Sequence, residues 1–225
     1  MIKVKGLVKK YKSGTLELAV LKGLDLEVKK GEFLSITGRS GSGKSTLLYQ
    51  LGLLDEPNAG EIIINDQDIS KLDSTERSRF RLNELGYIFQ DYALVPELTA
   101  FENVFVPLLM QGLEKKDAEN QAVNAMQKVG LSEKLKNLPS QLSGGEQQRV
   151  SIARAIGHNP KILFADEPTA NLDSETAETV LKTFLDLHRE GQTIVMVTHE
   201  PEYAALTDRI VLLLDGTIGS DKRNH

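Results

Sequence analysis

The residues between Gly38 and Thr46 have the types and spacing of a phosphate-binding loop. They follow an apolar run, Phe33 to Thr37, and precede the helix-forming run Leu47 to Leu51. Glycines here let successive backbone N–H groups turn toward one anion, and the following helix directs its positive end at the same point. Lys44 is placed to reach the β- and γ-phosphates of a nucleotide, and the Ser45 hydroxyl to bind Mg²⁺.

Every fixed position of this pattern is filled between a strand and a helix, so we prefer it to the alternative of a structural Gly/Ser turn. We predict nucleotide contacts from Gly38, Arg39, Ser40, Gly41, Ser42, Gly43, Lys44, Ser45 and Thr46.

Two carboxylates, Asp166 and Glu167, follow a second apolar run, Lys161 to Ala165. The Mg²⁺-binding aspartate of a P-loop NTPase lies at the end of such a strand, so Asp166 is the predicted metal ligand. Strand side chains alternate, which predicts that Glu167 points away from Asp166 toward an attacking water and acts as the general base. Taken alone, such a pair is more often a solvated turn. The phosphate loop with Lys44 upstream favours catalysis.

A second possible anion site begins at Ser143, where Ser-Gly-Gly stands directly before a helix-forming run. The backbone N–H groups of that helix N-terminus are available to a phosphate. The chain has only one phosphate loop, so two readings stay open from the residues alone. This segment either caps a helix and nothing more, or completes a nucleotide site on another copy of the protein.

The segment Leu142 to Gln148 resembles the signature sequence of ABC transporters. With Gly38 to Thr46 upstream and Asp166-Glu167 downstream, essentially the whole chain resembles the nucleotide-binding domains of that family. In that family the signature of one subunit closes over the γ-phosphate held by the other. The resemblance implies ATP and Mg²⁺ as cofactors and a head-to-tail ATP-sandwich dimer with a second copy. It also implies that the signature residues Ser143, Gly144, Gly145 and Glu146 take part in nucleotide binding.

Four further roles rest on the resemblance only. Tyr11 resembles the aromatic residue that stacks on adenine, and Asp173 the aspartate of the loop that crosses the dimer interface. Gln90 resembles the glutamine that meets Mg²⁺ and water, and His199 the switch histidine at the γ-phosphate. From the residues alone, a packing or surface tyrosine and a surface histidine would be the commoner interpretations, and Gln90 could be an ordinary strand-end amide.

The pattern of apolar residues predicts an α/β fold. Leu24, Leu26 and Val28 alternate with polar residues, and the isoleucine-rich stretch Glu61 to Ile69 is flanked by turn formers, so an antiparallel sheet is expected in the N-terminal third. Continuous aliphatic runs typical of parallel strands covered on both faces are Phe33 to Thr37, Lys161 to Ala165, Thr193 to Thr198 and Arg209 to Leu214. Residues 98 to 157 favour helices, and the polar residues 220 to 225 are expected to fray.

With the resemblance, this becomes a P-loop NTPase with a mostly parallel core sheet, an N-terminal antiparallel β-subdomain and a helical subdomain. We expect one ABC ATP-binding domain over residues 1–225. Residues 1–97 and 157–225 would form the core with the β-subdomain, and residues 98–156 a helical lobe that carries the signature.

Composition narrows the class of protein. The 225 residues are 40% hydrophobic and 26% charged, include no cysteine and carry a net charge of −5. Disulfides and zinc-thiolate sites are therefore excluded, and no nucleic-acid partner is expected. The apolar run Val104 to Met110 is far shorter than the roughly 20 residues of a membrane span. We expect a cytoplasmic protein, peripheral on the inner face of the cell membrane.

The segments 86–90, 94–104, 51–55 and 171–173 are similar to one branch of the family, the ATPases of macrolide and antimicrobial-peptide exporters, lipoprotein-release systems and the cell-division complex. The similarity implies integral-membrane permease subunits as partners. A soluble ABC ATPase acting on ribosomes or DNA is the alternative, but such proteins usually carry two nucleotide-binding domains or a long insertion. A P-loop kinase or GTPase would not need the segment Leu142 to Gln148.

Overall fold

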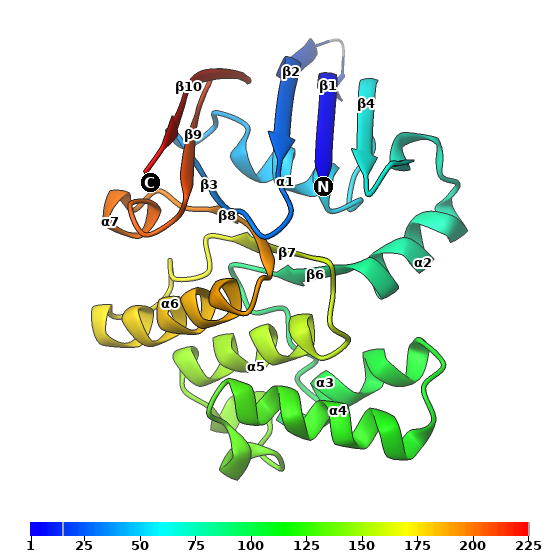
Figure 1. Cartoon of the computed structure of the whole chain (residues 1–225), viewed down its shortest axis with the longest axis vertical. Helices are drawn as coiled ribbons and strands as arrows, with labels where there is room; N and C mark the ends of the chain where they lie inside the picture. The colour runs from blue at the N-terminus through cyan, green and yellow to red at the C-terminus, as the bar shows by residue number, and fades with distance from the viewer. Residues whose placement is uncertain (15, 225) are drawn as a thin grey trace. The chain divides into compact units, whose positions relative to one another are not determined.

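The computed structural model describes residues 1–14 and 16–224 (Figure 1). The chain divides into two compact units. Unit 1 consists of Met1–Arg79 and Gly191–His225, and unit 2 of Phe80–Glu190. The short helix α2, Ser74–Glu84, contains the first boundary between them.

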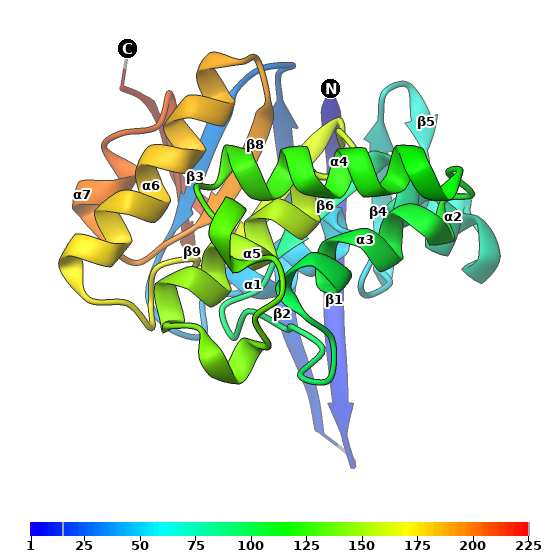
Figure 2. The ribbon, with the colours of Figure 1, turned by 90° about the horizontal axis from the view of Figure 1, so that it is seen from below.

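Unit 1 contains the predicted antiparallel sheet, with strand order β2-β1-β4-β5. Its strands are β1 (Ile2–Ser13), β2 (Leu16–Val28), β4 (Ala59–Ile64) and β5 (Gln67–Asp68). β1 and β2 form the long hairpin of Figure 2. Leu24, Leu26 and Val28 are buried while the residues between them are exposed, which confirms the alternation that the sequence predicted. A 3₁₀ turn, Ile69–Lys71, follows β5.

The second sheet region of unit 1 has strand order β10-β9-β3-β8. Its strands are β3 (Phe33–Thr37), β8 (Thr193–Val197), β9 (Arg209–Leu214) and β10 (Thr217–Arg223). β3 runs parallel to both β8 and β9, whereas β10 pairs antiparallel with β9. β8 is buried throughout and β3 almost throughout, as the continuous apolar runs predict. Helices α1 (Lys44–Leu51) and α7 (Pro201–Ala204) follow β3 and β8.

Two expectations at the C-terminus were wrong. β9 is not covered on both faces, since only Val211 and Leu213 of its six residues are buried and Leu214 remains 44% exposed. Residues 220–223 are not frayed but belong to β10, and residue 225 lies outside the described residues. Two bonds from the Arg209 guanidinium to Asp221, of 2.6 and 2.5 Å, fasten the strand, and the Asn224 amide donates to the Thr207 carbonyl at 2.7 Å. The polar groups of these residues thus form hydrogen bonds with other groups of the protein, which keeps residues 220–223 in the strand.

Unit 2 contains the parallel strands β6 (Leu85–Ile88) and β7 (Ile162–Asp166) and four longer helices. These are α3 (Ala100–Met110), α4 (Lys115–Lys128), α5 (Gly144–Ile156) and α6 (Ser174–Arg189). Short 3₁₀ turns lie at Ser132–Lys134 and Pro139–Gln141. α3, α4 and α5 pack against one another, and α6 packs on α5 (Figures 1 and 2). The predicted helical character of residues 98 to 157 is confirmed, whereas the proposed lobe boundary at 98–156 stays a prediction.

None of the helices in the described part of the chain combines the length and the apolar content that a membrane span requires.

Candidate nucleotide-binding site

The loop from Gly38 to Gly43 connects β3 to α1 in unit 1 and needs its glycines for two different reasons. At Gly38 a Cβ would collide with the backbone carbonyl of Leu213 and lie 2.7 Å from Ser42 Oγ. Gly41 and Gly43 have φ of +78° and +101°, in the left-handed region that side chains avoid. The glycines thus allow a tight loop whose backbone lies open in front of the first turn of α1.

Lys44 stabilises the conformation of this loop through hydrogen bonds to its backbone carbonyls. Its Nζ donates to the carbonyls of Gly38 at 3.0 Å and of Arg39 at 3.2 Å, and its side chain is almost fully buried. Among the described residues, the buried hydroxyl of Ser42 has no hydrogen-bond partner. A buried polar atom without a partner costs free energy, so an anion in the loop would supply what the protein lacks. The loop residues therefore fit a bound phosphate.

Tyr11 on β1 has a half-exposed ring, and its hydroxyl is fixed by a hydrogen bond. The hydroxyl donates to Asp55 at 2.7 Å, and the Lys9 ammonium donates to the same carboxylate at 2.7 Å and to the Glu56 carbonyl at 2.7 Å. Lys9 Nζ also lies 4.8 Å from the centroid of the Tyr11 ring. Burial, followed by the hydrogen bond to Asp55, raises the pKa of Tyr11 to about 12. The ring is therefore held by its hydroxyl and has Lys9 over one face, while 41% of the residue stays exposed.

His199 follows β8, and Gly38 follows β3. Because these strands are parallel neighbours, their carboxyl ends meet at one edge of the sheet, where ligands bind in α/β folds. The His199 side chain is half exposed, with its Nε2 3.0 Å from Glu200 Oε1. The structure thus brings His199 to the same edge of unit 1 as the phosphate loop.

The corresponding edge of unit 2 carries the two carboxylates. β7 ends at Asp166, which is 4% exposed. β6 is the parallel neighbour of β7, and Ile88 at its end pairs with Ala165. Gln90 follows shortly after the end of β6, so it lies near the same edge as Asp166. Glu167 has a φ of +43°, so the chain leaves the strand geometry there and strand alternation does not set its direction. The prediction that strand alternation sets the direction of the Glu167 side chain was therefore wrong, because residue 167 has a left-handed backbone conformation and not an extended one. Such a costly conformation in a non-glycine residue is typical of functional sites.

Ser143 begins α5 with a capping box. Its hydroxyl accepts from the Glu146 N–H at 3.3 Å, and Glu146 accepts from the Ser143 N–H at 2.8 Å. The backbone hydrogen bond from Ser143 is the main cause of a lowered pKa at Glu146, which Lys134 also contacts at 3.0 Å. Ser143 therefore does cap α5, but the N–H groups of Gly144 and Gly145 lie in the first turn, where a helix offers them no partner of its own, so both readings of this segment stay open.

Both signature glycines lie against other parts of the predicted site in unit 2. A Cβ at Gly144 would lie 2.9 Å from the Tyr92 hydroxyl and 3.6 Å from Leu172, and one at Gly145 would collide with Thr176. Asp173 caps α6 by accepting from the Thr176 N–H, and Asn171 donates to the Gln90 carbonyl at 3.0 Å. The structure thus brings the signature, the Asp173 loop and Gln90 together.

The oxygen donors suit Mg²⁺. Ser45 supplies a hydroxyl in the first turn of α1, and Asp166 a buried carboxylate at the end of β7. Mg²⁺ in nucleotide sites binds to one or two such protein oxygens together with substrate phosphates and water. Each of these two residues, Ser45 in unit 1 and Asp166 in unit 2, therefore offers the type of donor that this ion prefers.

Comparisons with known proteins agree with this geometry. The family model described as "ABC transporter" matches residues 21–170. The chain belongs to the ABC transporter family. It is 51% identical over 88% of its length to the lipoprotein-releasing system ATP-binding protein LolD of Aquifex aeolicus, of which it covers 89%. The predicted ABC ATPase, with ATP and Mg²⁺ as cofactors, is confirmed at the level of this family.

Other similarities point to the same branch. The chain is 45% identical over its whole length to the macrolide export ATP-binding/permease protein MacB of Campylobacter fetus, and it spans 35% of that longer protein. Its fold matches a dimeric post-hydrolysis structure of the ATP-binding cassette MJ0796 bound to ADP and Pi, with a TM-score of 0.93 and 39% identity, covering 100% of this chain and 99% of that one. The predicted fold class and branch are confirmed. The role of each individual site residue stays a prediction.

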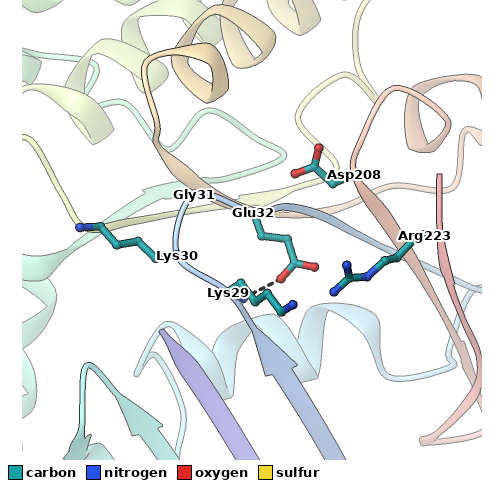
Figure 3. Close-up of a pocket in the computed structure, with 6 residues that line it drawn as sticks. All are labelled: Lys29, Lys30, Gly31, Glu32, Asp208 and Arg223. Carbon is teal, nitrogen blue, oxygen red and sulfur yellow. Dashed lines mark hydrogen bonds between the residues drawn. The ribbon is translucent and has the colours of Figure 1, made fainter. Parts of the chain in front are cut away.

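A pocket elsewhere in unit 1 has a structural explanation. It is lined by Lys29, Lys30, Gly31, Glu32, Asp208 and Arg223 (Figure 3). Glu32 accepts from the Lys29 N–H at 2.6 Å, and Asp208 accepts from the Phe33 N–H at 2.9 Å. These carboxylates order the turn that leads into β3, and no predicted site residue lines the pocket.

Several residues around the site were missed from the sequence. Lys9 and Asp55 support Tyr11, while Tyr92 and Thr176 contact the signature glycines. The spacing of Asp173 and Thr176 matches a helix N-cap followed by its third residue, which is a signal that could have identified this pair. Nothing in the sequence alone connects Asp55 to Tyr11, because they are 44 residues apart.

Proposed function

We propose that two copies of this ATPase bind ATP between them, head to tail, and drive integral-membrane permease subunits from the inner face of the cell membrane. One observation carries the proposal. In the described part of the chain, α1 and α5 each begin with glycine-containing N-termini suited to phosphate, but a phosphate loop precedes only α1. A second copy is the natural source of the nucleotide for α5. The dimeric state described for the similar cassette MJ0796 supports this arrangement.

In this proposal each residue has a definite task. Tyr11 stacks on the adenine, the loop Gly38 to Thr46 holds the phosphates, and the partner's nucleotide meets Ser143 to Glu146. Ser45, Gln90 and Asp166 hold Mg²⁺, which would neutralise phosphate charge. Glu167 accepts the proton of the attacking water, with His199 at the γ-phosphate and Asp173 at the interface.

The relatives suggest the type of work that hydrolysis drives. LolD is named for lipoprotein release and MacB for macrolide export. We therefore propose export, or mechanical work across the membrane, on a lipoprotein, peptide or hydrophobic compound. No nucleic-acid partner is proposed.

Co-purification tests the proposal. The Glu167→Gln variant should retain ATP without hydrolysing it, so its dimer and partners stay together. Cells expressing it are solubilised with ATP and Mg²⁺, and the associated proteins are identified by mass spectrometry. A matched Glu167→Gln, Lys44→Ala variant, which lacks the phosphate-binding lysine, is the control. Recovery of a protein with transmembrane helices only in the first sample supports the proposal. Recovery of ribosomes or DNA-repair proteins instead would overturn it.

A further inference from the structure

The methyl group of Thr176 fills the space beside Gly145. A Cβ built at Gly145 would lie far inside 3.0 Å of Thr176 Cγ2, closer than real Cβ atoms approach other atoms. Gly145 is buried, and Thr176 is half buried at the start of α6. This chain's own packing therefore requires glycine at position 145, independently of any nucleotide.

The same threonine also holds Asp173. Its Oγ1 donates to one carboxylate oxygen at 2.7 Å, and its backbone N–H donates to the other at 3.0 Å. A carboxylate offers about four acceptor positions, so Asp173 can still accept hydrogen bonds from a partner. Asp173 is exposed, as a residue that meets a partner must be.

A second contact joins the same two segments. Leu172 Cδ2 lies 3.6 Å from the position of a Cβ at Gly144. The signature glycines and the Asp173 loop therefore approach each other at two successive points, and Thr176 contacts both a signature glycine and the Asp173 carboxylate.

We propose that Thr176 is a positioning residue that fixes Asp173 and the signature glycines to each other, so that a second copy of the chain meets them as one preformed surface. This inference rests on the proposed function, in which both segments face the partner. A preformed surface loses less conformational entropy on association, and dimerisation is correspondingly tighter. Thr176 itself does not touch the nucleotide in this proposal.

Two substitutions separate the functions of the side chain. Thr176→Val keeps the shape and the methyl group but removes the hydroxyl, whereas Thr176→Ser keeps the hydroxyl and removes the methyl group. Both are made in the Glu167→Gln background, and the dissociation constant of the ATP-dependent dimer is measured by light scattering or sedimentation. We expect Thr176→Val to raise this constant about tenfold, because Asp173 loses a hydrogen bond that orients it, and Thr176→Ser to raise it less, about threefold, because it loses only the methyl contact at Gly145.

A matched control and a second readout exclude a general effect on stability. Thr183→Val removes a similar hydroxyl from the same helix, where it donates to the Thr179 carbonyl at 3.2 Å, and should leave dimerisation unchanged. Binding of a fluorescent ATP analogue to the dilute, monomeric chain should be equal in all variants. Equal weakening by Thr176→Val, Thr176→Ser and Thr183→Val would overturn the inference, as would no weakening by Thr176→Val.

The packing contact has a test of its own that needs no nucleotide. Gly145→Ala should lower the midpoint of thermal unfolding, because its Cβ meets the Thr176 methyl group. Adding Thr176→Ser removes that methyl group and should recover most of the loss in a double-mutant cycle. Additive effects of the two substitutions would contradict the contact.

Asp173→Ala separates this inference from the proposed function. If Asp173→Ala weakens the dimer and Thr176→Val does not, the role of Thr176 is wrong and the proposed interface stands. If the Glu167→Gln parent itself forms no ATP-dependent dimer, the proposed function fails and the inference fails with it.

Discussion

The hydroxyl of Tyr11 donates a 2.7 Å hydrogen bond to Asp55, from a strand to a loop 44 residues away. Partial burial, together with this bond, raises the pKa of Tyr11 to about 12 from an ordinary value near 10. Folding favours the protonated hydroxyl, so the contribution of this group to stability is complete below pH 10 and is lost as the pH rises toward 12.

We therefore expect one tyrosine of the folded chain to ionise late. Ultraviolet absorbance of tyrosinate, followed from neutral pH upward, should show a titration near pH 12 that is absent from the Tyr11→Phe variant. The pKa of Tyr92 is also raised by burial, so Tyr92→Phe is the comparison that identifies which residue is observed. An unchanged titration curve in Tyr11→Phe would contradict the hydrogen bond.

Asp55→Asn tests whether the network orients the ring of Tyr11. The amide keeps the size of the side chain but removes the charge that holds Lys9 at 2.7 Å. We expect KM for ATP to rise severalfold, with kcat at saturating ATP nearly unchanged, because only adenine binding is affected. Glu17→Gln is the control, since it breaks the exposed Lys10–Glu17 pair on the same hairpin. A fall in kcat with constant KM would argue against a role in adenine binding.

Glu167→Gln should slow ATP hydrolysis by roughly 10² to 10⁴, which is the usual contribution of a general base. Equilibrium binding of ATP should persist, because the phosphate loop is untouched. Phosphate release and nucleotide binding are measured on the same preparation. The exposed helix residue Glu175 provides the control Glu175→Gln, which should hydrolyse ATP normally. Hydrolysis near the normal rate in Glu167→Gln would remove this residue as the base.

Gly38→Ala and Gly41→Ala should differ although both lie in the phosphate loop. A Cβ at Gly38 meets the Leu213 backbone, whereas a Cβ at Gly41 meets nothing within 4 Å. Gly41→Ala therefore carries only the cost of a left-handed alanine, about 1 kcal/mol. We expect the larger loss of unfolding free energy for Gly38→Ala, measured by urea denaturation. Equal losses would show that the loop moves to admit the side chain.

Arg209→Met should loosen the hairpin of β9 and β10. The hydrogen bond from Arg209 is the main cause of the lowered pKa of Asp221. A lowered folded pKa means that the pair stabilises the protein above the unfolded value of about 3.9 and that this contribution is lost as the pH falls through the folded value. The free energy of unfolding of the variant should be about 1 to 3 kcal/mol lower than that of the parent at neutral pH.

Urea denaturation at neutral and acidic pH checks this expectation. The difference between the variant and the parent should shrink in acid, where Asp221 is protonated in both. Lys128→Met, which removes the exposed pair with Glu190, is the control and should have little effect at either pH. A difference that is constant with pH would show that Arg209 stabilises through its packing and its hydrogen bond to the Glu27 carbonyl rather than through Asp221.

The sequence predicted local features well because they depend on near neighbours. The phosphate loop, its strand and its helix are continuous in the chain, and β3 was located at its observed bounds. The buried strands before Asp166 and His199 were found from their apolar runs, and the signature helix from its cap. The order of these segments was also sufficient to predict the family.

The failures have physical reasons that no local pattern contains. The direction of Glu167 was argued from a pleat that ends one residue earlier, since a left-handed φ cannot be read from a glutamate in the sequence. Residues 220–223 read as a frayed tail because their pairing with β9 depends on a guanidinium twelve residues upstream.

Residue types and spacing by themselves determined that this chain binds and hydrolyses a nucleotide, because phosphate chemistry needs a short continuous loop. Only the tertiary structure placed Asp55 and Lys9 at Tyr11, and Thr176 between Gly145 and Asp173. These contacts join segments from separate parts of the chain. They depend on how strands and helices pack, and packing is decided by the whole sequence at once.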